Sequence, residues 1–567
     1  MTKAAAVAVR KDEGFKFCAN EPSILGEPWV AMYSTSEPVS FDKSHFEKAM
    51  LYIIKEPNIN STAILRADIL SEKHYEVSKE HTLIDSKETT FELNDSDAKM
   101  ININDMTLRD VPLSDSLELV TKHETVRRII PRNPYKDALM NQTCLVMNST
   151  KYDDTSLIIY KPHINKEDVC PFYIPHVDAV AILLHQKTLS VHYIPFEYDG
   201  ATSEETKIIE EKVSNTLVNV RLHRAQLFDE SERVVRTAYR LLQTSFKHSR
   251  GIMQGYEKKV NHDQVVNKVK FQDRYTNLKK KYSKYLVENW VESTDPKKHV
   301  FEDIGIAAFL IELWIIIYGE DFKNKMQFRD LGCGNGALCY ILIQEGIHGI
   351  GIDARQRKSW AIYPQEVKNC LKEQVIIPSI LLRPPPEVRK SMPHIQHNGG
   401  IFPVKVAHEY IAPATIIYSS QDLLKSPHVN IAEYPKNTFI IGNHSDELTC
   451  WIPLLGYPFM VIPCCSHNLA GQRVRYNNTK RDSKMKNSTY AGLVDHVENI
   501  ASKVGWKVEK EMLRIPSTRN AALIGYKNES LGKFPTKVVY ESLIEEGGAD
   551  GWIQNTMALT KRNPRGH

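Results

Sequence analysis

The sequence predicts an α/β fold with a central, mostly parallel sheet in its C-terminal half, preceded by an N-terminal α+β region. In Gln327–Leu342, a short apolar run leads into a Gly-x-Gly-x-Gly turn and then into apolar residues at helical spacing. A second apolar run, Ile347–Ile352, ends at Asp353, and similar runs continue as far as Tyr526. Repeated strand–loop–helix units imply a parallel sheet with helices on both faces.

The elements after Asp353 follow from the same reasoning. Gln374–Leu382 is a strand or a helix end, and Met392–Gly400 reads as an irregular insertion. We expect three strands, at Thr415–Ser419, Thr438–Gly442 and Phe459–Ile462, followed by a helix at Tyr490–Val504. Lys507–Arg514 and Ala521–Tyr526 should close the sheet as an antiparallel hairpin.

Upstream elements are less regular. Val180–Phe196 predicts two strands joined by a short turn, and apolar residues recur at helical spacing in Glu230–Leu242 and Gln264–Trp290. Ile304–Tyr318 is the longest apolar run, but Glu312 interrupts it and it is too short to span a bilayer, so we expect a buried helix. Residues 528–567 form a polar tail with one helix at Val538–Glu546.

Composition sets outer bounds on the protein class. The 567 residues are 42% hydrophobic and 25% charged, as in globular proteins. Nine cysteines occur without a paired CxxC, and only Cys464 and Cys465 are adjacent, which favours a reducing compartment and argues against a disulfide framework or a zinc site. The N-terminus has no apolar core long enough for a secretory signal.

The net charge is only +4, but basic residues are concentrated in two stretches. Tyr256–Lys284 contains nine Lys/Arg against three Asp/Glu, and Arg473–Lys486 contains six against one. Such stretches can bind a polyanion, although each can also be a solvated surface. In the second stretch, the candidate contacts to a nucleic acid are Arg473, Arg475, Tyr476, Lys480 and Arg481.

Ligands of open α/β sheets bind beyond the carboxyl ends of the strands. The turn glycines Gly332, Gly334 and Gly336 would let a ligand approach the backbone. The sequence DLGCGNG resembles motif I of S-adenosylmethionine (SAM) methyltransferases, and another nucleotide or a purely structural turn are the alternatives.

If the turn binds SAM, three carboxylates near the strand ends are candidates for contacting the cofactor. Asp330 could receive the SAM ammonium, Asp353 could hold the ribose hydroxyls, and Asp422 could accept the adenine amino group. A helix cap is the alternative role for Asp422.

The fourth and fifth expected strands end in polar segments where a methyl group would project. Asp446 and His467 are the candidates for orienting or deprotonating an acceptor, with helix capping as the alternative for Asp446. Lys298, His299 and Arg519 are further candidates for orienting the acceptor.

Six segments carry a more specific resemblance: FEDIGIAAFLIELW, RDLGCGNGALCYIL, GIDAR, IIGNHSDELTCWIP, IPCCSHN and LRIPSTRN. They are similar to the tRNA (uridine 2′-O-)methyltransferase family that modifies the uridine at position 44 of serine tRNAs. The resemblance implies a Rossmann-like SAM-dependent methyltransferase domain, SAM as cofactor and tRNA as substrate. From the cysteine pattern and the apolar runs described above, we also expect a cytoplasmic protein without a membrane, metal or disulfide-linked partner.

With this resemblance, we divide the chain into four parts. Residues 1–230 form a family-specific region that could bind substrate, 231–290 a basic helical connector, 291–530 the methyltransferase domain and 531–567 a C-terminal tail. A methyltransferase acting on another RNA position or on protein, and an RNA-binding protein with a SAM-binding fold, are the alternative functions.

Overall fold

The computed structural model describes residues 14–78, 82–91, 97–165, 168–196, 224–256, 262–383, 401–408, 411–476, 488–528, 536–549 and 551–560. The chain divides into two compact units, Met1–Glu257 and Lys258–His567. Each unit has its own sheet and is described by itself below.

The first unit is built on a ten-stranded sheet, ordered β1-β2-β10-β9-β8-β7-β6-β3-β4 with β5 beside β7. Apart from the parallel pair β5–β7, its neighbours are antiparallel. The hairpin expected at Val180–Phe196 is confirmed as β9 and β10. The strands are β1 (Phe15–Phe17), β2 (Val30–Thr35), β3 (Ile64–Tyr75), β4 (Leu83–Glu88), β5 (Met100–Ile101), β6 (Leu119–Pro131), β7 (Leu139–Ser149), β8 (Ser156–Pro162), β9 (Ala179–His185) and β10 (Thr188–Ile194).

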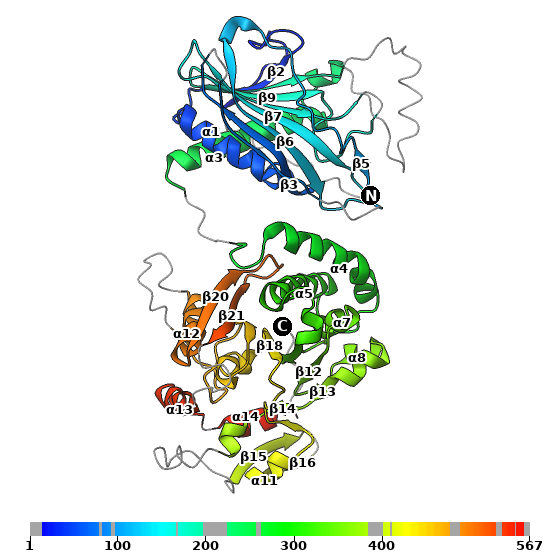
Figure 1. Ribbon diagram of the computed structural model, residues 1–567, viewed down its shortest axis with the longest axis vertical. Coiled ribbons are helices and arrows are strands. Elements are labelled where there is room, and N and C mark those ends of the chain that lie inside the picture. The colour runs from blue at the N-terminus through cyan, green and yellow to red at the C-terminus, as the bar shows by residue number, and fades with distance from the viewer. Residues whose placement is uncertain are drawn as a thin grey trace. The chain divides into compact units, whose positions relative to one another are not determined.

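Two helices, α1 (Lys43–Lys55) and α3 (Arg233–Met253), pack beside each other on this sheet (Figure 1). Both are amphipathic, and their apolar faces share one core with side chains from β2, β8, β9 and β10. The helical spacing in Glu230–Leu242 therefore correctly predicted a helix, although α3 extends eleven residues further, to Met253.

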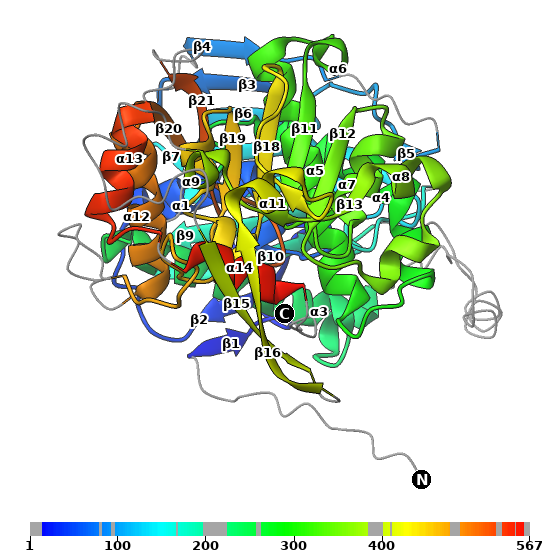
Figure 2. The same cartoon turned by 90° about the horizontal axis from the view of Figure 1, so that it is seen from below.

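The second unit contains a seven-stranded sheet ordered β13-β12-β11-β18-β19-β21-β20. Its first five strands are parallel, and β21 and β20 close the sheet as an antiparallel hairpin. Several of these strands can be followed side by side in Figure 2. They are β11 (Gln327–Leu331), β12 (Gly349–Asp353), β13 (Leu371–Glu373), β18 (Thr438–Asn443), β19 (Phe459–Ile462), β20 (Trp506–Met512) and β21 (Ala521–Asn528).

Helices cover both faces of this sheet. Phe439 and Ile441 of β18 belong to a core with α4 (Lys268–Glu288), α5 (Pro296–Tyr318) and α7 (Ala337–Gln344), whereas the intervening Ile440 belongs to a core with α12 (Thr489–Lys503). This alternation is the period of two of a strand with both faces buried. The smaller helices are α6 (Phe322–Lys325), α8 (Gln365–Cys370), α9 (Ser379–Leu382) and α11 (Ser420–Lys425).

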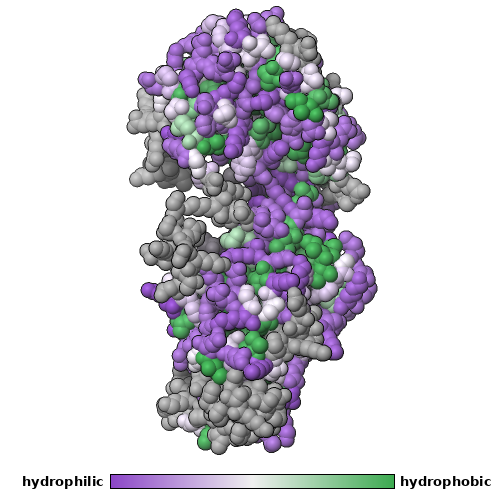
Figure 3. All heavy atoms as spheres, turned by 60° about the vertical axis from the view of Figure 1, so that its left-hand side comes forward, coloured by the Kyte–Doolittle hydropathy of each residue, from purple (hydrophilic) through white to green (hydrophobic). Residues whose placement is uncertain are grey.

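The apolar run Ile304–Tyr318 lies in α5, whose residues from Ile304 to Trp314 are all buried, as the sequence predicted. Within the described residues, no helix has the length and apolar character to cross a membrane. The face in Figure 3 is mostly hydrophilic, with apolar residues in small scattered patches.

One strand assignment was wrong. Thr415–Ser419 belongs to β16 (Ile411–Ser419), which pairs with β15 (Ile401–His408) in a separate two-stranded hairpin. The third parallel strand of the main sheet is β13, whose sequence Leu-Lys-Glu is too short and polar to be recognised by its apolar pattern. Val375–Ile376 forms β14, paired with β17 (Val429–Asn430) outside the main sheet.

The C-terminal segment folds back onto the second unit. The helix expected at Val538–Glu546 is confirmed as α13 (Thr536–Glu545), but α14 (Trp552–Leu559) was missed. The Trp552 indole is 1% exposed and donates a hydrogen bond to the carbonyl of Ile376 over 3.1 Å. The tail therefore contributes to the core, because Trp552 and the neighbouring Ile553, which is 4% exposed, anchor this short helix.

A buried carboxylate anchors the chain before α4. Glu511 of β20, 2% exposed, accepts hydrogen bonds from the backbone N–H groups of Asp263, Gln264 and Val265 over 2.8, 2.6 and 2.9 Å. In Glu511→Gln, one acceptor oxygen becomes a donor and faces an N–H group. We expect a loss of about 2–3 kcal/mol of unfolding free energy in urea titrations.

The matched control is Glu541→Gln, which removes the charge from an exposed pair with Lys537 on α13. This change should alter the unfolding free energy by less than about 0.5 kcal/mol. Equal stabilities of the two variants would show that Glu511 is not an anchor.

Candidate functional site

The parallel register brings three strand ends to one edge of the second sheet. Leu331 of β11 pairs with Ile352 of β12, and Asp330 pairs with Ile441 of β18. The segments that follow these strands therefore meet at the carboxyl edge, where ligands of such sheets bind.

A cavity of about 570 Å³ lies at this edge, within the usual size range of small-molecule sites. Its walls come from the loops after β11, β12 and β18, the N-terminal part of α5, the loop between β20 and β21, and α14. The lining residues used below are Lys298, His299, Glu302, Asp303, Gly332, Gly334, Asn335, Asp353, Arg355, Arg357, Asn443, His444, Ser445, Asp446, Cys464, Arg519, Trp552 and Thr556.

The three glycines of the turn have different roles, although each has a positive φ, of 81°, 53° and 77° in chain order. A Cβ on Gly332 would lie 3.4 Å from Ser445, and one on Gly336 would lie 3.2 Å from Leu371. A Cβ on Gly334 would meet nothing within 4 Å. Gly332 and Gly336 therefore permit packing, and Gly334 exposes its backbone to the cavity.

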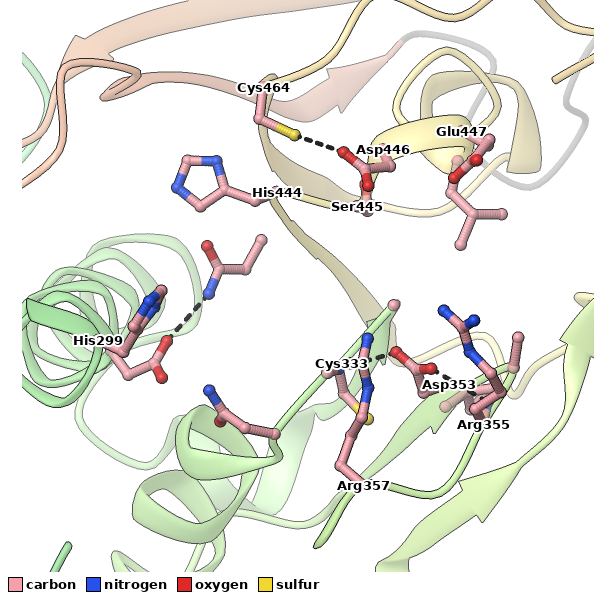
Figure 4. A pocket seen from close by; sticks show the side chains of 18 of the residues that line it. His299, Cys333, Asp353, Arg355, Arg357, His444, Ser445, Asp446, Glu447 and Cys464 are labelled. Atoms are coloured by element: carbon pink, nitrogen blue, oxygen red, sulfur yellow. Dashed lines mark hydrogen bonds between the residues drawn. The ribbon is translucent and has the colours of Figure 1, made fainter. Parts of the chain in front are cut away.

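Asp353, at the end of β12, is held firmly and faces the cavity (Figure 4). Its carboxylate is 9% exposed and accepts hydrogen bonds from the N–H groups of Gly334, over 2.9 Å, and Arg355, over 3.1 Å. Each bond uses one oxygen, so both oxygens keep acceptor capacity for a pair of ligand hydroxyls. The structure thus brings Gly332, Gly334 and Asp353 to one pocket.

Asp330 is not brought there. It is 1% exposed, does not line the cavity, and accepts its hydrogen bond from Cys339 Sγ over 3.4 Å. Burial raises its pKa to about 7. Because side chains alternate along β11, its carboxylate lies beneath the turn and packs against α7.

The acidic wall of the cavity comes instead from α5. Asn443 Nδ2 donates to Asp303 Oδ1 over 3.0 Å, and His444 Nε2 lies 3.0 Å from Glu302 Oε1, so two consecutive acids hold the last residue of β18 and the residue that follows it. Burial, then the charges of Glu302 and Asp330, raise the pKa of Asp303 well above its usual range. The sequence did not single out this pair, although two acids directly before the apolar run Ile304–Tyr318 were a visible signal.

His299 lies one turn earlier on α5 and also lines the cavity. Its ring stacks on Trp290 with centroids 6.1 Å apart. Burial lowers its pKa, which favours the neutral imidazole at neutral pH. With Lys298 and Arg519, all three residues considered as orienting groups line the cavity.

Asp446 lines the cavity opposite Asp353 in the view of Figure 4. It has a φ of 44°, and His444 two residues earlier has a φ of 51°. Left-handed backbone at two non-glycine residues marks a loop held in a strained shape, which is typical of functional sites. Cys464 Sγ donates to Asp446 Oδ1 over 3.0 Å and fixes that carboxylate.

Asp446, Cys464 and Cys465 have ligand atoms within 4.8 Å of one another, the one such group of three among the residues that the structure describes. The guanidinium of Arg519 lies 3.6 Å from Cys465 Sγ and puts a positive charge beside the cluster. The positive charge of Arg519 disfavours a cation at this cluster, and two of its members, Asp446 and Cys464, form part of the cavity wall.

Other predicted site residues lie elsewhere. His467 is 2% exposed and does not line the cavity, because the segment after β19 turns inward and its backbone carbonyl binds Tyr476 and Cys450. Asp422 is exposed and forms a capping box with Ser419 at the start of α11, on the separate hairpin. Asp422 is therefore a helix-capping residue, the alternative role considered for it, and does not line the cavity.

Of the five predicted nucleic-acid contacts, Arg473 and Arg475 are exposed. Tyr476 stacks on His496 with centroids 3.8 Å apart, and its hydroxyl donates to the carbonyl of His467. Its ring is thus already used in packing. Lys480 and Arg481 lie outside the described residues, as does Met392–Gly400.

Comparisons with known proteins agree with the division of the chain into the two units Met1–Glu257 and Lys258–His567. Residues 11–259 match the family described as "TRM44-like, N-terminal bet v1-like domain", and residues 265–378 match "Predicted AdoMet-dependent methyltransferase". No solved structure matches the chain.

Three relatives, all named tRNA (uracil-O(2)-)-methyltransferase, illustrate the range of similarity. The Saccharomyces cerevisiae protein is 63% identical over 98% of this chain and 96% of its own length. The Kluyveromyces lactis protein is 61% identical over 97% of this chain and 99% of its own length. The Schizosaccharomyces pombe protein is 34% identical over 92% of this chain and 91% of its own length.

The burial of Asp330 predicts a dependence of stability on pH. Because its folded pKa, about 7, exceeds the unfolded value of 3.8, its contribution to stability is complete below pH 3.8 and is lost as pH rises through 7. The loss amounts to about 4 kcal/mol at 1.36 kcal/mol per pKa unit. In urea titrations from pH 4 to 8, Asp330→Asn should lack this loss.

Asp321→Asn is the control. The hydrogen bond from Lys325 lowers the pKa of this exposed carboxylate, so its contribution is present above pH 3.8 and is lost only in more acidic solution. This variant should follow the wild type above pH 5. Parallel curves for Asp330→Asn and the wild type would mean that Asp330 is ionised in the folded protein.

Proposed function

Since this chain belongs to the fungal tRNA (uracil-O(2)-)-methyltransferase family, we propose that it methylates the 2′-oxygen of uridine 44 in serine tRNAs. The enzyme is SAM-dependent and transfers a methyl group to a uridine ribose of tRNA. The choice of serine tRNA and of position 44 rests on the family resemblance of the segments IIGNHSDELTCWIP, IPCCSHN and LRIPSTRN. Similarity over almost the whole chain is the observation that supports the proposal most.

The residues of the pocket fit SAM. The empty space before Gly334 leaves its backbone open to the ligand, and the two oxygens of Asp353 can accept the 2′- and 3′-hydroxyls of the ribose. A cavity of about 570 Å³ has the volume of a small-molecule site. The strand order, with its parallel core and closing antiparallel hairpin, supports a Rossmann-like platform for this cofactor.

Asp303 is our choice for the SAM ammonium in place of Asp330. It lines the cavity, whereas Asp330 is enclosed behind the turn. A cation beside Asp303 would offset the burial that raises the pKa of this carboxyl, so cofactor binding and ionisation of Asp303 should be coupled.

When bound, SAM supplies an activated methyl group and a sulfur leaving group. The chain's own contribution is to hold the 2′-oxygen in line, which is worth ~7–11 kcal/mol in well-oriented model reactions. Asp446 lines the cavity and is fixed by Cys464, so we propose that its carboxylate accepts the proton of the uridine 2′-hydroxyl. His467 has no role in this step, because it is enclosed away from the cavity.

Arg473 and Arg475 are proposed to contact the tRNA backbone near the cavity, together with Lys480 and Arg481 of the same basic stretch. All nine cysteines are free thiols. This agrees with a reducing compartment, and we propose the cytoplasm as the location.

Nucleoside analysis tests the proposal. The purified chain, incubated with SAM and unmodified serine tRNA, should produce 2′-O-methyluridine at position 44, detected by digestion and mass spectrometry. Asp353→Ala should abolish product and SAM binding measured by calorimetry, because it removes the acceptors of both ribose hydroxyls. A serine tRNA with uridine 44 replaced by cytidine is the control substrate, and methylation elsewhere would refute the position.

Asp446→Asn tests the acceptor side. With saturating tRNA and SAM, its single-turnover rate should fall ~10²–10⁴-fold, because an amide cannot take the proton, while both affinities stay at wild-type values. Asp422→Asn, an exposed carboxylate outside the cavity, is the matched control and should keep the parental rate. An Asp446→Asn enzyme with the parental rate would leave Asp446 with a structural role.

A further inference from the structure

The first unit has one strongly charged feature that the reaction at the second unit does not use. The 21-residue helix α3 contains five Lys/Arg and no Asp or Glu. All five cations are exposed, while the opposite face is buried in the core with Val234, Val235, Ala238 and Leu242. The exposed cations are Arg233, Arg236, Arg240, Lys247 and Arg250.

Three of these cations, Arg236, Arg240 and Lys247, form no ion pair or hydrogen bond through their side chains with any described residue. Helix α4 differs, because its Arg274 pairs with Glu312 and its Lys281 with Glu345, each over 2.8 Å. Helix α4 also contains two acids of its own, whereas α3 contains none, so among the described residues part of the charge on α4 is neutralised and that of Arg236, Arg240 and Lys247 is not.

Uncompensated like charges on one helix face oppose folding. Arg236 and Arg240 are four residues apart, the spacing at which like charges destabilise a helix by a few tenths of a kcal/mol. A helix that merely covered the sheet would have the same core with glutamate among its exposed residues. The basic face therefore points to an external anion.

The spacing suits a phosphate chain. At 1.5 Å per residue, Arg236 and Arg240 are separated by about 6 Å along the helix and Lys247 follows about 10 Å further on. The first interval is comparable with the separation of successive phosphates on one strand. Arginine matches phosphate geometry through two parallel N–H donors.

Within the part of the chain that the structure describes, Arg236, Arg240 and Lys247 are exposed, so this face is open to an anion. We do not count Arg233 as part of this face, because its guanidinium stacks over Phe172, 3.5 Å from the ring centroid. The nearest acids in sequence, Glu230 and Glu232, precede the helix, and Glu230 accepts a hydrogen bond from Tyr33. The positive face thus begins at Arg236.

We propose that Arg236, Arg240 and Lys247 on α3 bind the phosphate backbone of the tRNA, which makes the N-terminal unit a substrate-binding unit of the enzyme. This inference rests on the proposed function, because it takes tRNA as the polyanion. A tRNA carries phosphates along its whole length, so a surface remote from the modified ribose can add affinity. Backbone contacts carry no base information, so recognition of the tRNA sequence is not assigned to this face.

The test replaces all three residues in the full-length chain, as R236Q/R240Q/K247Q. Glutamine has a helix propensity close to that of Arg and Lys, so α3 should be retained. The matched control K87Q/K99Q/K151Q removes three exposed lysines from strands and turns of the same unit and changes the net charge equally. Fluorescence anisotropy measures tRNA binding over a series of KCl concentrations.

The α3 variant should bind tRNA roughly tenfold or more weakly at moderate salt, and the slope of log K against log [KCl] should fall by about 2–3, at 0.7–0.9 per lost contact. The control variant should have the tRNA affinity and the salt slope of the wild type. SAM affinity by calorimetry should be unchanged in both. R236K/R240K, which keeps the charges, should restore most of the affinity.

Equal tRNA affinity and salt slope for the α3 and control variants would overturn the proposal, whatever other partner the helix then binds. The same holds if R236K/R240K loses as much affinity as the triple variant with its fold intact, because the loss would then not follow the charge. Failure of the proposed function is a separate result, in which the wild type binds tRNA but leaves uridine 44 unmethylated.

Discussion

The conformation of one turn is the constraint on which the functional site depends. Gly332, Gly334 and Gly336 all have a positive φ, and the space beside two of them is taken by Ser445 and Leu371. A side chain at Gly336 would press on Leu371 of β13, and at both positions the positive φ would strain any residue other than glycine. The turn is also tied to β12, since the N–H of Gly334 binds the carboxylate of Asp353. The backbone shape of the turn and the position of the Asp353 carboxylate are therefore coupled.

A second constraint is the burial of acidic groups beneath and beside that turn. Asp330, Glu302 and Asp303 are each less than 7% exposed, and burial raises the pKa of Asp330 and of Asp303. Such an arrangement is costly for folding, because like charges in a region of low dielectric repel one another. It is favourable for a cationic ligand, whose charge offsets the repulsion. On the function proposed above, the acids that line the cavity, Glu302 and Asp303, would gain from a positively charged cofactor what their burial costs the free protein.

Several parts of the molecule could be predicted from the sequence because their physical cause is local. The glycine turn between an apolar strand and an apolar helix, the closing hairpin of β20 and β21, and the amphipathic α3 all follow from residue spacing. Asp422 was assigned to the pocket because its strand has the right apolar pattern, but that strand pairs with β15 outside the main sheet. Strand pairing is a non-local property, and β13, with the sequence Leu-Lys-Glu, gives no local signal.

By itself, the sequence determined the family, the reaction and the cofactor, and it identified three residues that line the pocket: Gly332 and Gly334 in the turn after β11, and Asp353 at the end of β12. These depend on motifs that are contiguous in the chain. Only the tertiary structure decided which acid lines the cavity, because Asp330 and Asp303 are both acids beside apolar runs and differ in the direction that their strand and helix give them. The same holds for His467, turned inward after β19, and for Trp552, which brings the C-terminal helix to the pocket. The direction of a side chain depends on packing between distant segments, and residue spacing along one segment does not contain it.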